Sequence, residues 1–194
     1  MGSVTRIIAG FAGSLVLTVP KAGTRPTSDR VREAIFSALD SRDLIDGARV
    51  VDLYAGSGAL GLEAASRGAT SVSLVENGAA AIAACRRNVT AVLRNAPRNN
   101  PPSIDVTTQP VQAFLTGAMA EWDIAFLDPP YELRLPELAA TLEALSPRLA
   151  PDAVVVIERS SRDPEPTWPQ GLQLDRRKDY GDTTLWWARS TRPA

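Results

Sequence analysis

The chain has 194 residues, a formal net charge of −1, 44% hydrophobic residues and 22% charged residues. This composition fits one soluble domain, and no apolar run approaches the ~18–20 residues that cross a bilayer. The absence of histidine and the single cysteine, Cys85, exclude His-dependent catalytic triads, histidine or zinc-cluster metal sites and an internal disulfide. Because Met1–Gly10 has no signal-like apolar core, we expect a cytoplasmic protein.

The first predicted element is a small hairpin. The apolar stretches Arg6–Gly10 and Leu15–Val19 are separated by glycines, which favours two short strands and a turn. We therefore divide the chain into a hairpin extension over residues 1–27 and a main domain over residues 28–194. Residues 1–32 have an excess of basic over acidic side chains, which fits either a solvated face or an arm that contacts phosphates. The basic residues are Arg6, Lys21, Arg25, Arg30 and Arg32, against Asp29 alone.

Helices and strands alternate through the rest of the chain. Ser28 is the expected N-cap of a helix whose apolar residues recur every four positions, at Val31, Ile35 and Leu39. Strands are then predicted at Val50–Tyr54, Ser71–Val75, Ile104–Thr108, Asp123–Leu127 and Ala153–Ile157, with helices at Ala59–Arg67, Ala79–Leu93, Val111–Met119 and Pro136–Leu145. This alternation predicts an α/β fold with a mostly parallel sheet covered by helices on both faces. Leu172–Leu174 and Thr183–Ala188 flank a turn-prone segment and predict an antiparallel edge hairpin.

A glycine-rich loop follows the first strand of this domain. Gly56-Ser57-Gly58-Ala59-Leu60-Gly61 matches G-x-G-x-x-G between a predicted strand and helix, the context in which that motif binds a nucleoside cofactor. At the end of the next strand, the Glu76 carboxylate can accept hydrogen bonds from ribose hydroxyls. The glycine-rich loop and Glu76 do not by themselves show whether the cofactor is NAD or S-adenosylmethionine. Asp52 favours S-adenosylmethionine, because an acid inside the strand can steady the loop or the methionyl ammonium.

A rigid tetrad follows the fourth strand of the alternating pattern. Asp128-Pro129-Pro130-Tyr131 is expected at the carboxyl end of that strand, where ligands of doubly wound sheets bind. The Asp128 side chain and the Pro129 carbonyl can hold the two hydrogens of an amino group on an aromatic ring. Its nitrogen lone pair then turns toward a methyl donor, while Tyr131 stacks on the base. The pattern predicts transfer of a methyl group to an exocyclic amine.

Several segments resemble one known family, the RsmD-type small-subunit ribosomal RNA guanine-N2 methyltransferases. The resemblance extends over essentially Val4 to Arg189. It is carried by Arg6–Gly10, Thr24–Phe36, Val51–Ala64, Asp128–Tyr131 and Tyr180–Thr183, of which Arg25–Phe36 is the most specific. It implies a class I S-adenosylmethionine-dependent methyltransferase fold, Rossmann-like and seven-stranded, with an N-terminal hairpin. It also implies S-adenosylmethionine as cofactor and a guanine of 16S ribosomal RNA as target, within the 30S subunit or an assembly intermediate.

The resemblance and the motifs together give an expected set of site residues. The catalytic set is Asp128, Pro129, Pro130 and Tyr131. The cofactor set is Asp52, Tyr54, Ala55, Gly56, Ser57, Gly58, Gly61, Glu76, Asn77 and Gln112. Many class I enzymes read the adenine amino group with an acid after the third strand, whereas Gln109-Pro110-Val111-Gln112 has none here, so Gln112 and backbone groups are expected to do so. RNA contacts are expected from Arg6, Arg25, Thr27 and Arg30, and we expect a monomer.

Three alternatives stay open at this point. Amino methyltransferases that act on DNA bases or on a protein glutamine use similar tetrads, although they usually carry a longer recognition segment. An NAD(P)-dependent oxidoreductase would use the glycine loop but gives Asp128–Tyr131 no role. A catalytically inactive RNA-binding module would not need an intact tetrad.

Overall fold

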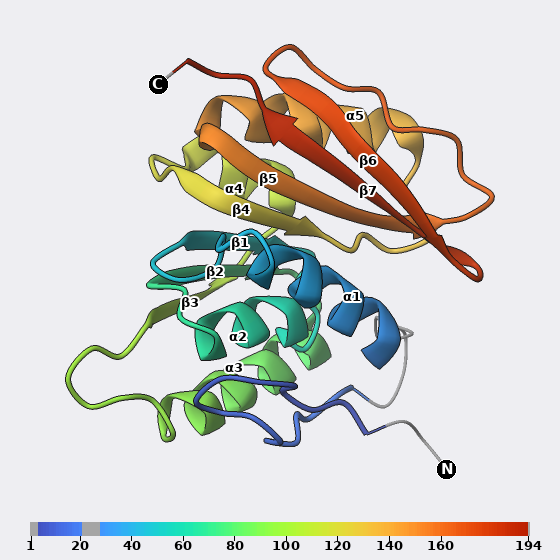
Figure 1. Ribbon diagram of the computed structural model, residues 1–194. Helices are drawn as coiled ribbons and strands as arrows, with labels where there is room; N and C mark the ends of the chain where they lie inside the picture. The colour runs from blue at the N-terminus through green and yellow to red at the C-terminus, as the bar shows by residue number, and fades with distance from the viewer. Residues whose placement is uncertain (1–3, 21–27, 194) are drawn as a thin grey trace.

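The computed structural model describes residues 4–20 and 28–193. Its centre is a seven-stranded sheet in the order β3-β2-β1-β4-β5-β7-β6. Strands β1 to β5 run parallel, and β7 and β6 close the sheet as an antiparallel pair (Figure 1). The strands are β1 (Arg49–Leu53), β2 (Ser71–Glu76), β3 (Ser103–Thr108), β4 (Trp122–Leu127), β5 (Leu149–Ser160), β6 (Leu172–Tyr180) and β7 (Thr183–Ser190).

Helices cover both faces of the sheet because side chains along each strand alternate between two apolar clusters. Val50 of β1 faces α1 (Asp29–Asp40), α2 (Ala59–Ser66) and α3 (Ala79–Leu93). Its neighbour Val51 faces α4 (Val111–Gly117) and α5 (Leu135–Leu145), and the short 3-10 helix η1 (Ser146–Arg148) follows α5 directly. None of the helices in the described ranges has the length and hydrophobicity that crossing a membrane requires. The predicted α/β class with helices on both faces is confirmed.

The N-terminal segment, residues 4–20, packs on the same face as α2 and α3 (Figure 1). Its two halves run antiparallel, with the backbone N–H of Ile7 donating to Leu15 at 2.9 Å and that of Leu17 donating to Thr5 at 2.9 Å. The pairing amounts to one isolated bridge, between Arg6 and Val16, so the predicted hairpin forms without regular strands. The reason is a contact with α2. The N–H groups of Ile8 and Ala9 donate to the Glu63 carboxylate on that helix instead of to a partner strand.

The C-terminal hairpin is longer than predicted. Strands β6 and β7 are continuous up to a two-residue turn at Gly181 and Asp182, and Gly181 takes a left-handed φ of 61°.

Ser28 is the N-cap of α1, since its hydroxyl accepts from the Val31 N–H at 3.2 Å. The carboxyl ends of β1, β2 and β4 meet at one edge, the carboxyl edge, where the predicted motifs lie.

Candidate active site

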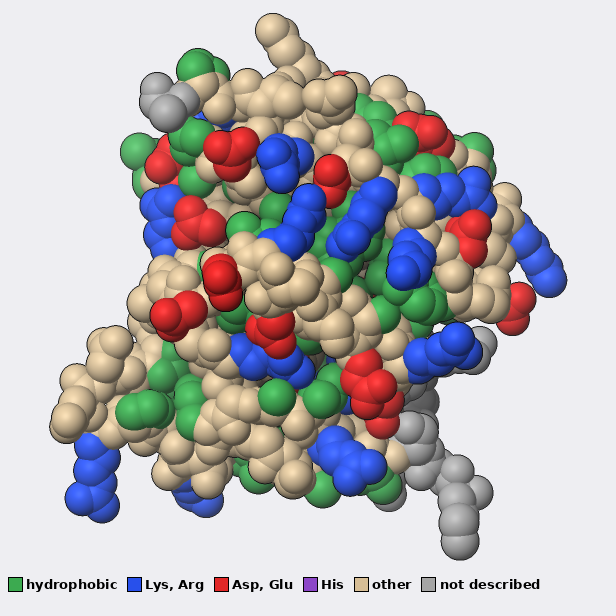
Figure 2. Space-filling view, viewed as in Figure 1, with side chains coloured by type: hydrophobic (Ala, Val, Ile, Leu, Met, Phe, Trp, Pro, Cys, Tyr) green, Lys and Arg blue, Asp and Glu red, His purple; other side chains and the backbone are tan. Residues whose placement is uncertain are grey.

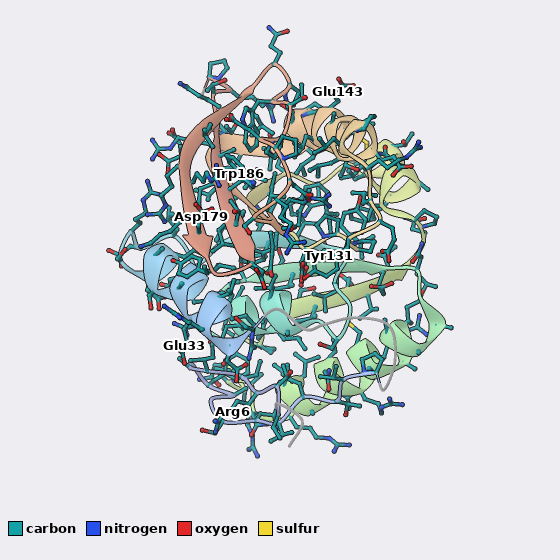
Figure 3. All side chains as sticks on the ribbon, turned by 90° about the vertical axis from the view of Figure 1, so that its right-hand side faces the viewer. Arg6, Glu33, Tyr131, Glu143, Asp179 and Trp186 are labelled. Carbon is teal, nitrogen blue, oxygen red and sulfur yellow. The ribbon has the colours of Figure 1, made fainter. Side chains whose placement is uncertain are left out.

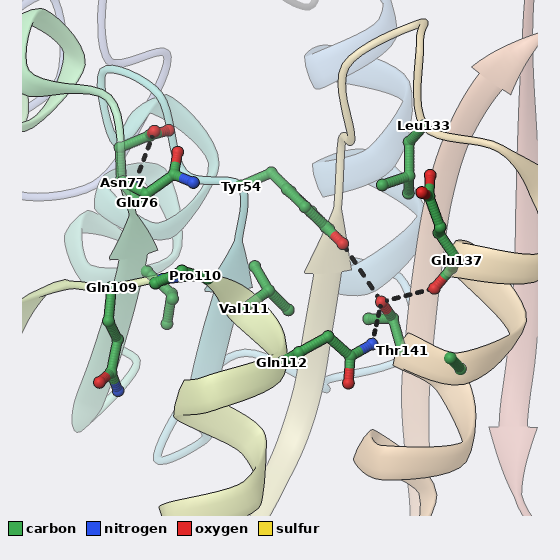
Figure 4. Close-up of a pocket in the computed structure, with 12 residues that line it drawn as sticks. Tyr54, Glu76, Asn77, Gln109, Pro110, Val111, Gln112, Leu133, Glu137 and Thr141 are labelled. Atoms are coloured by element: carbon green, nitrogen blue, oxygen red, sulfur yellow. Dashed lines mark hydrogen bonds between the residues drawn. The ribbon is translucent and has the colours of Figure 1, made fainter.

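A cleft of about 350 Å³ opens at the carboxyl edge. It lies between the ends of β1 and β2, the start of α4 and the first half of α5 (Figure 4). Its volume falls in the range of small-ligand sites, ~300–1,000 Å³. It is lined by Tyr54, Val75, Glu76, Asn77, Gln109, Pro110, Val111, Gln112, Leu133, Glu137, Ala140 and Thr141.

A hydrogen-bonded group joins three elements at one side of this cleft (Figure 4). The buried Thr141 hydroxyl donates to the Glu137 carbonyl at 3.0 Å, which uses its single hydrogen. Thr141 therefore accepts from the Tyr54 hydroxyl at 3.2 Å and from the Gln112 amide nitrogen at 3.0 Å. Burial raises the pKa of the Tyr54 hydroxyl, so this tyrosine stays protonated and able to donate. The Gln112 amide nitrogen uses one of its two hydrogens in this bond, and its amide oxygen is an acceptor.

The glycine loop is held by the Glu76 carboxylate. Glu76 accepts from the Gly56 N–H at 2.9 Å and from the N–H groups of Asn77 and Gly78 at 2.8 and 2.7 Å. A carboxylate has about four acceptor positions, so one remains after these three bonds. A Cβ placed on Gly56 would meet nothing within 4 Å. The loop therefore has a fixed backbone with open space above Gly56.

Asp52 lies beneath this loop, with 1% of its surface exposed. One carboxylate oxygen accepts from the Gly61 N–H at 2.9 Å. Burial raises the pKa of Asp52 to about 7, the Gly61 hydrogen bond opposes this, and the charges of Asp128 and Glu76 add to it. A Cβ on Gly61 would lie 2.4 Å from the Leu74 side chain. Asp52 and Gly61 thus seat α2 against the sheet and steady the loop from below.

The raised pKa of Asp52 predicts a pH-dependent stability. Because the folded chain holds a proton that the unfolded chain releases, this group makes stability fall as pH rises from about 4 to about 7. The slope is at most about 1.4 kcal/mol per pH unit. Asp52→Asn should remove that component, so its stability relative to wild type should rise with pH across this window in urea unfolding. The exposed control Asp105→Asn should follow the wild type. A parallel pH profile for Asp52→Asn would contradict the assignment.

The tetrad Asp128–Tyr131 continues directly from β4 at the carboxyl edge. Pro129 is buried, whereas Tyr131 is 65% exposed and lies near the middle of this edge (Figure 3). The Leu133 N–H donates to the Pro130 carbonyl at 2.9 Å, which closes a turn. Leu127, the last residue of β4, pairs with Leu53, the last residue of β1, so Asp128 follows β4 beside the start of the glycine loop, and its charge adds to the raised pKa of Asp52. None of the four tetrad residues lines the cleft itself; Leu133, two positions after Tyr131, is the first residue past the tetrad that does.

The predicted cofactor-binding and RNA-contacting residues fall into three groups. Four of the predicted cofactor residues line the cleft: Tyr54, Glu76, Asn77 and Gln112. The others form the adjacent loop or lie under it: Asp52, Ala55, Gly56, Ser57, Gly58 and Gly61. Of the predicted RNA-contacting residues, Arg6 and Arg30 are exposed, whereas Arg25 and Thr27 lie outside the described residues.

Sequence reasoning did not single out several polar side chains that hold the site together. Glu63 on α2 is fully buried and accepts from Ile8 and Ala9 of the N-terminal segment and from Arg67. Arg159 at the end of β5 is 6% exposed and donates to the Leu133 carbonyl at 2.9 Å. Asn88 on α3 contacts both the N-terminal segment and the glycine loop. For Glu63 and Arg159 the available signal was a charged residue within an otherwise apolar helix or strand, whereas Asn88 had no such signal.

The strand order, the glycine loop after β1 and the tetrad after β4 define a class I methyltransferase fold. The solved structure of yhhF from Escherichia coli superimposes with a TM-score of 0.81 at 33% identity, covering 95% of this chain and 97% of that one. Magnesium protoporphyrin IX methyltransferase from Synechocystis, solved with bound S-adenosylmethionine, has the same fold. Its TM-score is 0.64 at 13% identity, covering 87% of each chain.

The family follows from the sequence comparisons. The model of the family described as "Conserved hypothetical protein 95" matches residues 5–189. Ribosomal RNA small subunit methyltransferase D of Escherichia coli (strain K12) is 34% identical over 177 residues, which covers 91% of this chain and 85% of that protein. The chain therefore belongs to this family, and the resemblance inferred from its motifs is confirmed.

Proposed function

We propose that the chain transfers a methyl group from S-adenosylmethionine to the exocyclic N2 amino group of a guanine in 16S ribosomal RNA. The printed name of its relatives, ribosomal RNA small subunit methyltransferase D, supports the substrate class. The observation that carries the proposal is the position of Asp128–Tyr131. The tetrad begins where β4 ends, and Leu133, two residues past it, lines a nucleoside-sized cleft.

The cleft and loop fit this cofactor. The open space above Gly56 admits a ligand close to the backbone, and Glu76 keeps one acceptor position for a ribose hydroxyl. Tyr54, Val111 and Leu133 give the cleft apolar walls for a purine, and Gln112 presents its amide oxygen as an acceptor for an amino group. S-adenosylmethionine, when bound, supplies a methyl group on a positively charged sulfur. This charge complements the acids around the loop.

The tetrad suits an amino group on an aromatic ring. Its nitrogen lone pair is delocalised into the ring, so the amine is a weak nucleophile unless its geometry is fixed. The Asp128 carboxylate and the Pro129 carbonyl hold the two amino hydrogens, and Asp128 accepts the proton that is released. Tyr131, which is 65% exposed, stacks on the base, a contact worth ~1–3 kcal/mol. Positioning of this kind can supply ~7–11 kcal/mol of a reaction barrier.

RNA contact depends on local charge, because the net charge of −1 gives no overall attraction. Arg6 lies on the N-terminal segment and Arg30 in the first turn of α1, both exposed (Figure 3 labels Arg6). Figure 2 shows further Lys and Arg side chains over β6 and β7. We propose that Arg6, Arg25, Thr27 and Arg30 contact phosphates, with residues 1–27 as an RNA-contacting extension of the domain over residues 28–194. The chain would act as a cytoplasmic monomer on the 30S subunit or an assembly intermediate.

The proposal is tested by transfer of tritium from methyl-labelled S-adenosylmethionine. The substrates are unmodified 16S RNA, free and in 30S particles, with DNA and a glutamine-containing peptide as comparisons. We expect label in RNA alone, recovered as N2-methylguanosine after digestion to nucleosides. Label in DNA or in the peptide, or in another nucleoside, would replace this substrate by one of the alternatives.

Glu76→Ala should weaken S-adenosylmethionine binding by roughly 10- to 100-fold. The variant loses a hydrogen bond to a charged acceptor, worth ~1.5–3 kcal/mol, and frees the Gly56 N–H that Glu76 holds. Isothermal titration calorimetry measures the change, and Glu143→Ala on the outer face of α5 is a matched control. Wild-type affinity in Glu76→Ala would rule out the ribose role.

A further inference from the structure

Asn88, on α3, bridges the N-terminal segment and the glycine loop. Its amide nitrogen donates to the Thr18 carbonyl at 2.9 Å and to the Ser57 carbonyl at 2.8 Å. Its amide oxygen accepts from the Thr18 N–H at 2.8 Å. Both amide hydrogens are therefore used, and the residue is only 3% exposed. The side chain has no spare donor, so its orientation is fixed by its partners.

The glycine loop rests on α3 at two consecutive positions. A Cβ on Gly58 would lie 3.1 Å from the sulfur of Cys85, one turn before Asn88 on the same face of α3. Ser57, the residue before Gly58, is held by Asn88 through its carbonyl. On the opposite side, Glu76 holds the Gly56 N–H. The loop backbone is thus clamped between a carboxylate on β2 and an amide on α3.

The N-terminal segment, which is attached to both α2 and α3, holds Asn88 in place. Glu63 on α2 accepts from the Ile8 N–H at 2.6 Å and from the Ala9 N–H at 3.0 Å. The first half of the segment is therefore attached to α2, while Thr18 in the second half is attached to α3 through Asn88. The segment lies along both helices on the side away from the sheet (Figure 1).

From this geometry we infer that Asn88 is a positioning residue for the cofactor: it sets the Gly56–Gly58 loop for S-adenosylmethionine, with Thr18 as its fixed point. The inference rests on the proposed function, because that function places S-adenosylmethionine against this loop. It also gives residues 4–20 a role in cofactor affinity that does not require RNA. Asn88 acts on the cofactor through Ser57 and does not itself line the cleft.

Asn88→Asp separates cofactor positioning from simple packing. The variant keeps the shape of the side chain and an acceptor oxygen but replaces the amide nitrogen, which is the donor. At high pH its carboxylate faces the Thr18 and Ser57 carbonyls, which repel it. At low pH the protonated carboxyl can donate one hydrogen bond again. Cys85, whose pKa is raised to about 12, stays neutral throughout. Asp52, with a pKa of about 7, and Glu76 are present in both variant and wild type, so the comparison uses the ratio of the variant's dissociation constant to that of the wild type at each pH.

The experiment measures S-adenosylmethionine affinity by calorimetry in the absence of RNA, at several pH values between about 5.5 and about 8.5. For Asn88→Asp we expect a dissociation constant at least roughly tenfold above wild type at the high end, with the ratio shrinking as pH falls. Asn88→Ser, which leaves room for water, should weaken binding by a similar factor at every pH. Asn95→Asp, the same change at an exposed residue two positions after the end of α3, should match wild type.

Turnover supplies the second readout. With either Asn88 variant, the KM for S-adenosylmethionine should rise while kcat at saturating cofactor stays within about twofold of wild type. Wild-type affinity in both Asn88 variants would overturn the inference, as would a ratio for Asn88→Asp that does not change with pH. If Asn88→Asp fails to fold, Asn88→Ser decides alone by the same KM and kcat comparison. Wild-type protein that binds no S-adenosylmethionine would instead refute the proposed function.

Discussion

Asp128→Ala is expected to lower the rate of methyl transfer by at least about 100-fold while changing S-adenosylmethionine affinity by less than about threefold. In the proposed mechanism Asp128 holds an amino hydrogen and accepts the released proton, whereas the loop and the cleft hold the cofactor. Single-turnover transfer to 30S particles measures the rate, and calorimetry measures the affinity.

A matched carboxylate makes this result specific. Asp105→Ala removes an exposed acid from β3, away from the tetrad, and should leave both quantities unchanged. Asp128→Asn should retain part of the rate, because its amide oxygen still accepts a hydrogen bond but takes up a proton poorly. Near-normal turnover in Asp128→Ala would show that the amine is positioned by other groups.

Glu63→Ala should have the largest effect on stability, about 3–5 kcal/mol. Glu63 is fully buried and accepts from the Arg67 guanidinium at 2.6 Å and from two backbone N–H groups of the N-terminal segment. Truncation leaves both backbone donors without their acceptor and the Arg67 guanidinium with Asp40 as its remaining acid, and it also opens a cavity. Urea unfolding at neutral pH measures the loss.

The comparison for this prediction is Glu33→Ala, which removes an exposed acid from α1 and should cost less than about 0.5 kcal/mol. Glu63→Gln keeps the shape of the side chain and one acceptor oxygen, so its loss of stability should fall between those of Glu63→Ala and Glu33→Ala. If Glu63→Ala unfolds at the wild-type urea concentration, the attachment of the N-terminal segment to α2 contributes little to the folded state.

Sequence patterns predicted the central sheet well, because buried parallel strands are continuous apolar runs. In the helices between them, apolar residues recur at the three- and four-residue spacing of one helix face. The predicted bounds of α3, Ala79–Leu93, agree with the structure. Strand β5 was predicted at Ala153–Ile157 but extends over Leu149–Ser160. Its polar end is a strand because Glu158 to Ser160 pair with β7, a tertiary partner that local sequence does not reveal.

The candidate site was predictable where function depends on a contiguous motif. Gly56–Gly61 and Asp128–Tyr131 were found because turn residues follow strands at fixed spacing. Asn88, Glu63 and Thr141 were missed because their partners are distant in sequence: Asn88 and Thr18 are 70 residues apart, and Thr141 and Tyr54 are 87. A buried polar residue inside a helix resembles any solvated one until its partner is placed beside it.

The most direct test is a crystal structure of the protein with S-adenosylmethionine and a guanosine nucleotide. The account predicts an adenosyl group in the cleft with a ribose hydroxyl on Glu76. It also predicts the donor methyl carbon ~3–3.5 Å from the N2 nitrogen, whose hydrogens point at the Asp128 carboxylate and the Pro129 carbonyl. A guanine held with N2 away from Asp128, or a cofactor bound outside the cleft, would contradict it.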